Sequence, residues 1–537
     1  MDQVPERHAG GHPGVRWRGI VFISGLYTLA WGLLLSASGR YWDDWAALDL
    51  GAAASSAWSK QQGLFWQLDL LELLSALPGT ERVGHLLVFF AYLACALILY
   101  ALLGRVEGLS RQARVLLPAL FAVFPVNAAR YALVTLMYAV SLLVFMVGWW
   151  LLAADMKAPS ATRRVAAAAL LLFSLLSTGS LMVFIAVIPM YLAWEYVSAA
   201  EGRPEPRAML ARYGFLIVLP IAALLVRSIT LQPTGIYASY NSLSLSGALE
   251  AVDKLPKAFE ASIVEPIIHA FESSFPLIVL GGLACYSVVL LLFATTGEDS
   301  RTSWIEPLVM LGSGVVVFVL AVFPYLAVDK MPLLDGWESR HQLLVPFAGA
   351  LLAYALVSLI VRLLALEQRA SALVMSLLLS AFVFANIFVS FDFQAEWYKQ
   401  VSLMQRMAES EEMERGRHFI FTDLAADLNA AKPEYTAYEY NGMMRMAMGD
   451  ATRFGVDTNG TEFFDPLLMR EHQQYNCWEY EPTPVRYGVT ITRGEQDVTR
   501  ARAVLGLMRR EIFAPDEFRE RVADVVRIEV ERLPDAE

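Results

Sequence analysis

The chain has 537 residues, of which 56% are hydrophobic and 18% are charged, and its formal net charge is −11. This apolar fraction exceeds that of ordinary soluble domains, so the composition excludes a purely water-soluble protein and predicts contact with a lipid bilayer. The acidic balance excludes the basic surface with which proteins bind nucleic acids. The acidic residues are concentrated after about residue 390, which predicts a water-exposed domain there.

The first apolar run covers residues 20–38 and follows Arg16 and Arg18. Its length favours an uncleaved first span over a signal peptide, although a signal-peptidase site after residue 38 remains the alternative. A bilayer core requires about twenty apolar residues per helix, and by this criterion we expect a polytopic α-helical membrane protein of about eleven spans. The further spans are expected at residues 83–104, 112–126, 131–153, 165–177, 180–198, 213–231, 274–296, 304–327, 342–364 and 370–390.

The apolar stretch at residues 165–198 is interrupted only by Ser-Thr-Gly-Ser at residues 177–180, so it could be one helix or a tight hairpin. Cytoplasmic loops of membrane proteins carry an excess of Arg and Lys. With a hairpin, the basic short loops all fall on the side of the basic N-terminus. We therefore expect the hairpin, a cytoplasmic N-terminus and an extracytoplasmic C-terminal domain. The basic residues concerned are Arg105, Arg111, Arg114, Lys157, Arg163, Arg164, Arg203, Arg207, Arg212, Arg301, Arg362 and Arg369.

We expect residues 1–390 to form the membrane domain and residues 391–537 a small α+β domain. Residues 418–422, 485–492 and 525–530 have the composition of strands, and residues 498–512 have helical spacing. Aromatic residues between these segments suit either stacking on sugar rings or packing in a small core. These are Tyr435, Tyr438, Tyr440, Trp478 and Tyr480.

The motif RYWDDW at residues 40–45 follows the first span directly and places Asp43 and Asp44 between aromatic residues. One interpretation is that Trp42 and Trp45 belong to an interfacial aromatic belt and that the aspartates end the helix in water. The other is that one carboxylate serves as a general base beside an apolar wall, which raises its pKa, while its neighbour orients it or binds a divalent cation. The residues alone leave both interpretations open.

Paired acids in the first outer loop, on a scaffold of about eleven spans with a trailing extracytoplasmic domain, resemble the GT-C class of membrane glycosyltransferases. Within that class the chain is most similar to bacterial enzymes that use polyprenyl-phosphate sugars, including the O-antigen glucosyltransferase-like proteins. The resemblance in architecture covers nearly the whole chain, and its sharp motif is Asp43-Asp44. It implies that one of these acids activates the acceptor. It also implies a polyprenyl-phosphate-linked sugar as donor.

A second group of polar residues lies between the ninth and tenth expected spans. Arg340 offers a pair of parallel donors and Lys330 a point charge, and both suit a lipid phosphate. His341 could donate a hydrogen bond or a proton to the departing phosphate oxygen, and Glu338 could hold Arg340 in place. The alternative is that these charges snorkel from two helix ends.

Arg227 lies inside the apolar run at residues 215–231, where an unpaired charge costs about 3 kcal/mol or more. We therefore expect it to have a partner. It could reach the lipid phosphate of a donor, or it could pair structurally with an acid such as Asp69, Glu72 or Glu265.

These features predict a glycosyltransferase of the bacterial cytoplasmic membrane that uses a lipid-linked donor and acts on a glycan, lipid or protein acceptor. The chain has no Gly-rich nucleotide-binding loop, which favours a lipid-linked donor over a nucleotide sugar. A transporter or flippase of lipid-linked saccharides is one alternative, in which charges within the membrane mark the substrate path. A scaffold that binds envelope glycans without catalysis is the other.

Overall fold

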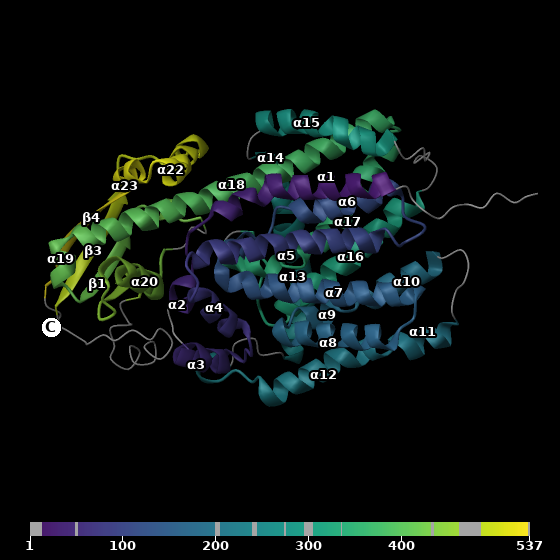
Figure 1. The fold of residues 1–537 in the computed structure, drawn as a ribbon, viewed down its shortest axis with the longest axis horizontal. Coiled ribbons are helices and arrows are strands. Elements are labelled where there is room, and N and C mark those ends of the chain that lie inside the picture. The colour runs from purple at the N-terminus through teal and green to yellow at the C-terminus, as the bar shows by residue number, and fades with distance from the viewer. Residues whose placement is uncertain are drawn as a thin grey trace, which may run out of the picture.

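The structure is a computed structural model that describes residues 13–48, 52–198, 205–238, 244–272, 275–294, 304–334, 336–430, 434–460 and 485–534. It consists of a body of roughly parallel long helices with a smaller mixed domain at one end (Figure 1). The long helices of this helical body are α1 (Pro13–Trp31), α5 (Thr80–Leu103), α6 (Arg111–Val123), α7 (Leu136–Lys157), α8 (Ala161–Ser177), α10 (Val187–Ser198), α12 (Phe215–Thr230), α15 (Phe275–Ala294), α16 (Ile305–Leu326), α17 (Val345–Leu363) and the first half of α18 (Gln368–Glu409).

Eight helical segments of the described residues are long and apolar enough to cross a membrane, and up to nine if a bent pair, Leu245–Glu272 and Phe275–Leu290, is one span. The chain is therefore a multi-pass helical membrane protein, as the composition predicts. The expectation of about eleven spans is not confirmed. Helix α6 has only 13 residues and α8 only 17, so at 1.5 Å per residue both are shorter than a hydrocarbon core of about 30 Å.

The apolar stretch at residues 165–198 forms separate helices. Helix α8 ends at Ser177, Thr178 is extended, and the chain continues as the short α9 (Leu181–Phe184) and α10. In Figure 1, α10 and the following α11 (Pro206–Tyr213) lie at the end of the helical body that is opposite to the mixed domain. The predicted break is confirmed, because a single helix cannot accommodate the extended backbone of Thr178.

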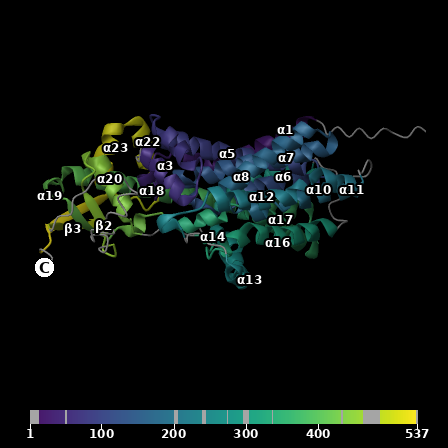
Figure 2. The same ribbon diagram turned by 90° about the horizontal axis from the view of Figure 1, so that it is seen from below.

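Short helices cover the end of the body that faces the mixed domain. They are α2 (Asp44–Ala47), α3 (Ala52–Gln62), α4 (Gln67–Ser75), η2 (Ala128–Tyr131), η3 (Leu133–Thr135) and η6 (Trp337–Gln342). A further segment consists of α13 (Leu245–Phe259), the π-helical η5 (Glu260–Val264) and α14 (Glu265–Glu272). Helix α13 projects from the helical body in Figure 2.

The mixed domain, here called the C-terminal domain, comprises the described residues from 391 to 534. Its sheet has the order β2-β1-β3-β4, in which β1 is parallel to β2 and β3, and β3 is antiparallel to β4. The strands are β1 (His418–Asp423), β2 (Phe454–Asp457), β3 (Arg486–Arg493) and β4 (Val526–Arg532), and the helices are α19 (Glu411–Arg415), α20 (Ala437–Met448), α22 (Ala501–Phe513) and α23 (Pro515–Val522). The three strands and the helix that the sequence predicts are confirmed. Strand β2 and α20 are not among the predicted elements, although Thr436 and Glu439 form a capping box at the start of α20.

The expected domain boundary at residue 390 falls inside α18, which continues without a break for 42 residues to Glu409. Such a helix is about 63 Å long, roughly twice the thickness of a hydrocarbon core. The apolar run ends near residue 390, but the helix continues because its second half packs against the sheet and α20. The membrane domain and the C-terminal domain are therefore joined by a rigid helix.

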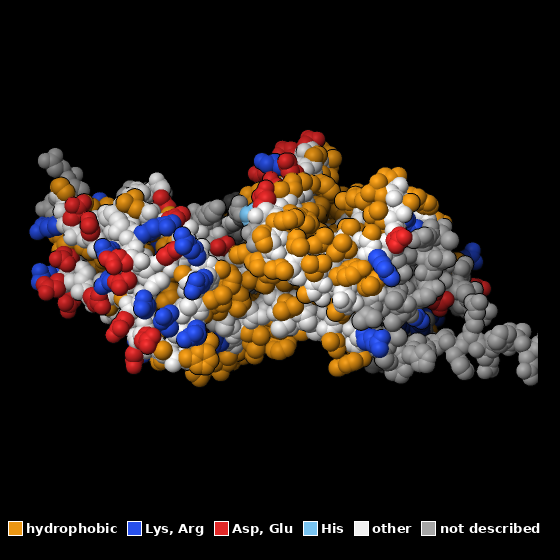
Figure 3. Space-filling model, turned by 90° about the horizontal axis from the view of Figure 1, so that it is seen from above, with side chains coloured by type: hydrophobic (Ala, Val, Ile, Leu, Met, Phe, Trp, Pro, Cys, Tyr) orange, Lys and Arg blue, Asp and Glu red, His pale blue; other side chains and the backbone are white. Residues whose placement is uncertain are grey.

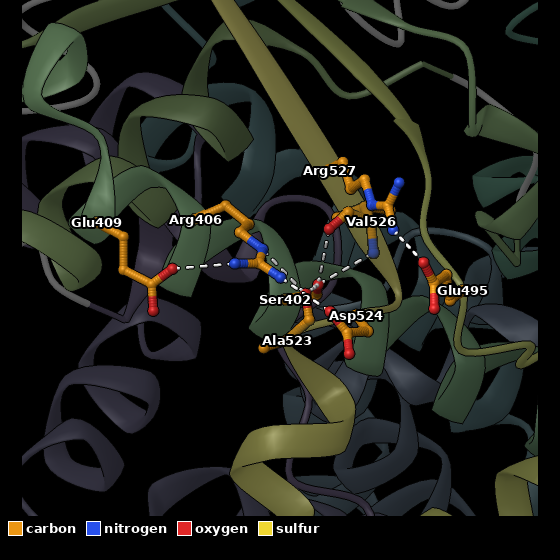
Figure 4. A network of polar contacts seen from close by, with 8 residues as sticks. All are labelled: Ser402, Arg406, Glu409, Glu495, Ala523, Asp524, Val526 and Arg527. Atoms are coloured by element: carbon orange, nitrogen blue, oxygen red, sulfur yellow. Dashed lines mark hydrogen bonds and ion pairs between the residues drawn. The ribbon is translucent and has the colours of Figure 1, made fainter.

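The second half of α18 holds the turn between α23 and β4 through polar contacts (Figure 4). The hydroxyl of Ser402 donates to the carbonyl of Ala523 over 2.9 Å and accepts the Val526 N–H over 3.0 Å. Arg406 donates to the same carbonyl over 3.0 Å and pairs with Asp524 over 3.0 Å. These bonds fix the connection between α23 and β4 on α18.

A buried ion pair fixes the first strand on the same helix. The ammonium of Lys399 lies 2.5 Å from the Asp423 carboxylate and donates to the side chain of Asn429 over 2.7 Å and to the carbonyl of Ala425 over 3.0 Å. Both charged side chains are almost fully excluded from solvent. Since a buried charge without its partner is costly, α18 and the end of β1 are stable only together.

We predict that Lys399→Met lowers the free energy of unfolding of the C-terminal domain by about 3–5 kcal/mol, because the variant leaves the Asp423 carboxylate buried without its cation. Thermal unfolding and limited proteolysis of the purified full-length protein measure the change. Arg415→Met removes an exposed ion pair with Glu411 and is the matched control, for which no measurable change is expected. Equal stability of the two variants would contradict the role of the buried pair.

Candidate functional site

The two adjacent aspartates have different environments. Asp44 is fully buried, and its carboxylate accepts three backbone N–H groups: Tyr41 at 3.1 Å, Leu133 at 2.9 Å and Val134 at 2.8 Å. Burial raises its pKa to about 7, and the three hydrogen bonds oppose this rise. Both carboxylate oxygens thus accept backbone N–H groups, and Asp44 joins the segment after α1 to η3.

Asp43 is only half-buried and faces groups from two other parts of the chain. It forms a side-chain hydrogen bond with Tyr438 of α20, and the positive charge of Arg340 acts on it. Burial raises the pKa of Asp43 to about 6, while Arg340 and the Tyr438 hydrogen bond hold it down. Asp43 is therefore largely ionised at neutral pH, yet its pKa is close enough to neutrality for it to accept a proton.

The Arg340 guanidinium is held beside Asp43 by two tryptophans. Its Cζ lies 4.3 Å from the ring centroid of Trp42, and that ring stacks on Trp337 at 5.1 Å with an interplanar angle of 11°. Arg340 also donates to the carbonyl of Trp337 over 3.3 Å. Trp42 has a positive φ of 53°, an uncommon conformation for a bulky residue that aims its ring at this stack. The RYWDDW motif thus meets the predicted second polar group.

Glu338 and His341 form a pair in the same segment. His341 Nδ1 lies 3.0 Å from the Glu338 carboxylate, and the imidazole packs on the ring of Tyr325 at 4.8 Å. Burial lowers the pKa of His341, so the ring is neutral at pH 7 and donates its Nδ1–H to Glu338. This hydrogen bond lowers the pKa of Glu338, and the positive charges of Arg340 and Lys330 lower it further. Lys330, Glu338, Arg340 and His341 are thus brought together.

The η6 segment that carries these residues is held against neighbouring segments of the body by two of its own polar side chains, which the sequence does not single out. The hydroxyl of Ser339 accepts the Ala129 N–H over 2.9 Å, and both residues are buried. The side chain of Gln342 accepts the Asn127 N–H over 3.4 Å and donates to Ala261 over 3.3 Å. In the sequence, the one sign of these contacts is that Ser339 and Gln342 are polar residues just before the apolar run that forms α17.

Arg227 lies in α12 and has a structural contact. Its guanidinium donates over 2.7 Å to the carbonyl of Leu176, one of the last carbonyls of α8. Such carbonyls lack an intrahelical partner, so the arginine satisfies the end of a neighbouring helix. Its observed partner is therefore this carbonyl, in place of the expected acids.

The C-terminal domain supplies one wall of the site through α20. A Cβ on Gly442 would lie 2.9 Å from Cβ of Trp45, so a glycine is required where α20 crosses α2. Glu439 of α20 is buried, and its pKa is raised to about 8 by burial and by neighbouring carboxylates. Of the aromatic residues predicted either to stack on sugars or to pack in a core, Tyr435 and Tyr440 are buried, whereas Tyr438 reaches Asp43. Trp478 and Tyr480 lie outside the described residues.

A cleft of about 410 Å³ lies beside this site, between the helical body and the C-terminal domain. Helices α1 and α18 line it with aromatic rings that include Trp31, Phe388 and Phe393, and later segments of the C-terminal domain line it with polar residues that include Asp427 and Thr499. Phe393 also contacts Trp337, with ring centroids 6.2 Å apart. The cleft and the Asp43 site thus share a wall.

The Asp44 carboxylate is largely committed to the backbone, since one oxygen accepts two N–H groups and the other accepts one. It is therefore a poor second ligand for a divalent cation beside Asp43. Among the described residues, no group of three or more His, Cys, Asp or Glu is arranged to hold a metal ion.

We predict that Asp44→Asn destabilises the fold by about 1–3 kcal/mol, because an amide NH₂ would replace one of the oxygens that accept backbone N–H groups. Asp43→Asn is the matched control, since the half-buried Asp43 carboxylate accepts none of these bonds. Thermal unfolding of both purified variants tests the difference. A larger loss for Asp43→Asn would contradict the assignment of Asp44 to the backbone.

Comparison of the chain with protein-family models and with curated proteins finds no match.

Proposed function

We propose that the chain is an integral membrane glycosyltransferase that moves a sugar from a polyprenyl-phosphate donor to an envelope glycan, lipid or protein acceptor. One observation carries this proposal: the ionised Asp43 lies between an arginine and a tyrosine, where the helical body meets the C-terminal domain. The site thus pairs a base of suitable pKa with a cation that suits a phosphate. Transfer from a lipid phosphate to a hydroxyl needs both groups in one place.

In the proposed step, Asp43 takes the proton of the acceptor hydroxyl and the acceptor oxygen attacks the anomeric carbon of the sugar. The bond between that carbon and the phosphate oxygen breaks, and the phosphate leaves with the electron pair. Arg340 and Lys330 stabilise the charge that develops on the phosphate. Neutral His341 gives its single N–H to Glu338, so its role is to support this segment.

We propose that the reaction takes place at the outer face of a bacterial cytoplasmic membrane, with the N-terminus in the cytoplasm. The support is charge bias, because the short connections between spans are rich in Arg and Lys. One of them contains α11, with Arg207 and Arg212, and lies at the end of the body opposite to the C-terminal domain (Figure 1).

We predict that Asp43→Asn lowers transfer by about 10²–10⁴-fold, because the amide cannot accept the hydroxyl proton. The assay measures labelled sugar reaching endogenous acceptor in membranes supplied with polyprenyl-phosphate sugar. The control is Glu411→Gln, which changes an exposed carboxylate on α19 outside the cleft and should retain transfer. Full activity of Asp43→Asn would remove the catalytic assignment, and transport of donor without transfer would favour a flippase.

We predict that Tyr438→Phe shifts the acidic limb of the pH–rate profile to higher pH. The hydrogen bond from the Tyr438 hydroxyl stabilises the Asp43 carboxylate, so its loss raises the Asp43 pKa above about 6 and the base is lost at higher pH. Tyr487→Phe, on β3, removes a hydroxyl elsewhere in the domain and should leave the limb unchanged. An unshifted limb in Tyr438→Phe would show that this hydroxyl does not tune the base.

A further inference from the structure

Helix α22 presents an exposed face that combines arginine with large apolar side chains. Arg502, Leu505, Arg509 and Ile512 recur at intervals of three and four residues, which places them on one side of a helix, and Phe513 adjoins them. All five are exposed, and Phe513 is 79% exposed. The opposite side of α22, which includes Val504, Leu507 and Met508, is buried in the domain.

This exposed face is unusual within the C-terminal domain. Among the described residues of that domain, five large apolar side chains are exposed. Leu505, Ile512 and Phe513 lie on α22, and the other two are Leu424 and Met446. Gathered apolar side chains on a water-exposed surface mark an interaction site. Within the described part of the chain, neither Arg502 nor Arg509 forms an ion pair, so their charges are available to an anionic partner.

The position of α22 indicates which partner it meets. The hydroxyl of Ser38 donates to the Glu511 carboxylate of α22 over 3.2 Å, and Ser38 lies two residues beyond the first candidate span, Trp17–Ser36. That span exposes Leu29 and Leu35 on its surface. An apolar surface that suits lipid therefore leads directly to α22, which lies beside the end of the helical body in Figure 1.

The helix is held at this level by rigid contacts. Glu511 also accepts a hydrogen bond from Tyr398 of α18 over 3.0 Å, and Ser402 and Arg406 of α18 bind the turn that follows α23 (Figure 4). Figure 3 shows Arg and Lys side chains gathered on the C-terminal domain where it borders the hydrophobic surface of the helical body. The exposed face is thus held beside the end of the first candidate span.

We propose that the exposed face of α22 binds the bilayer surface from which the C-terminal domain emerges, with a preference for anionic lipids. Arg502 and Arg509 pair with lipid phosphates, and Leu505, Ile512 and Phe513 insert among the headgroups. An amphipathic helix with arginines beside bulky apolar side chains is typical of such contacts. The inference does not depend on the proposed transfer reaction.

Hydrogen–deuterium exchange of the full-length protein tests the contact in nanodiscs of phosphatidylcholine alone and in nanodiscs that also contain phosphatidylglycerol. Backbone amides of residues 501–513 should exchange roughly fivefold more slowly with phosphatidylglycerol, since one arginine near an anionic surface contributes about a fivefold preference. Arg509→Glu should lose most of this slowing.

The matched control is Arg415→Glu, which reverses an exposed charge on α19 and should keep the full slowing. Equal exchange of wild-type residues 501–513 in the two lipids would overturn the proposal, and so would full slowing in Arg509→Glu. Slowing that depends on the number of protein copies per disc and not on phosphatidylglycerol would show instead that a second copy covers the face.

Discussion

The buried pair of Lys399 and Asp423 is the interaction on which the arrangement of the site depends. Lys399 belongs to the helix that leaves the helical body, and Asp423 ends the first strand of the C-terminal domain. Because each charge is sheltered from water, neither side chain is stable there without the other. The pair therefore sets where the sheet sits on α18, and the sheet in turn sets where α20 lies. Tyr438 reaches Asp43 only because this chain of contacts is intact.

Two neighbouring aspartates acquire opposite tasks through the local backbone. Asp43 immediately precedes α2 and Asp44 is its first residue, so successive side chains point about 100° apart. One carboxylate turns inward to three backbone N–H groups, and the other turns outward to Arg340 and Tyr438. The inward carboxylate holds the loop in shape, and the loop holds the outward carboxylate at the junction. Adjacent acids can thus serve as a support and a base without competing for one partner.

Hydropathy predicts much of the body because lipid-facing helices need apolar side chains along their whole length. The spans expected from hydropathy at α6 and α8 are not confirmed, because these helices have only 13 and 17 residues. Hydropathy also places the domain boundary at residue 390, because composition changes there although the helix does not end. Continuation of α18 depends on tertiary packing around residues such as Lys399, which no local pattern encodes.

The candidate site shows the same division. Asp43, Asp44 and the group from Lys330 to His341 stand out in the sequence because they are charged or polar residues set among long apolar and aromatic runs. Their separate orientations depend on contacts with η3 and α20, which are far away in the chain, so the sequence cannot assign them. Arg227 stands out for the same reason as Asp43, but its partner is a helix-end carbonyl, and a carbonyl has no sequence signature.

These contacts argue against treating the C-terminal domain as a detachable appendage. Tyr438 hydrogen-bonds to Asp43, Gly442 packs on Trp45, and Glu511 binds Ser38, so the domain meets the segment after α1 at three points. A rigid helix cannot release these contacts one at a time, because α18 enters the domain without a hinge. Under the proposed function, a lipid-linked donor would therefore approach from the bilayer side, and the acceptor would approach through the cleft between body and domain. The fixed domain would then exclude water from Asp43 while leaving both routes open.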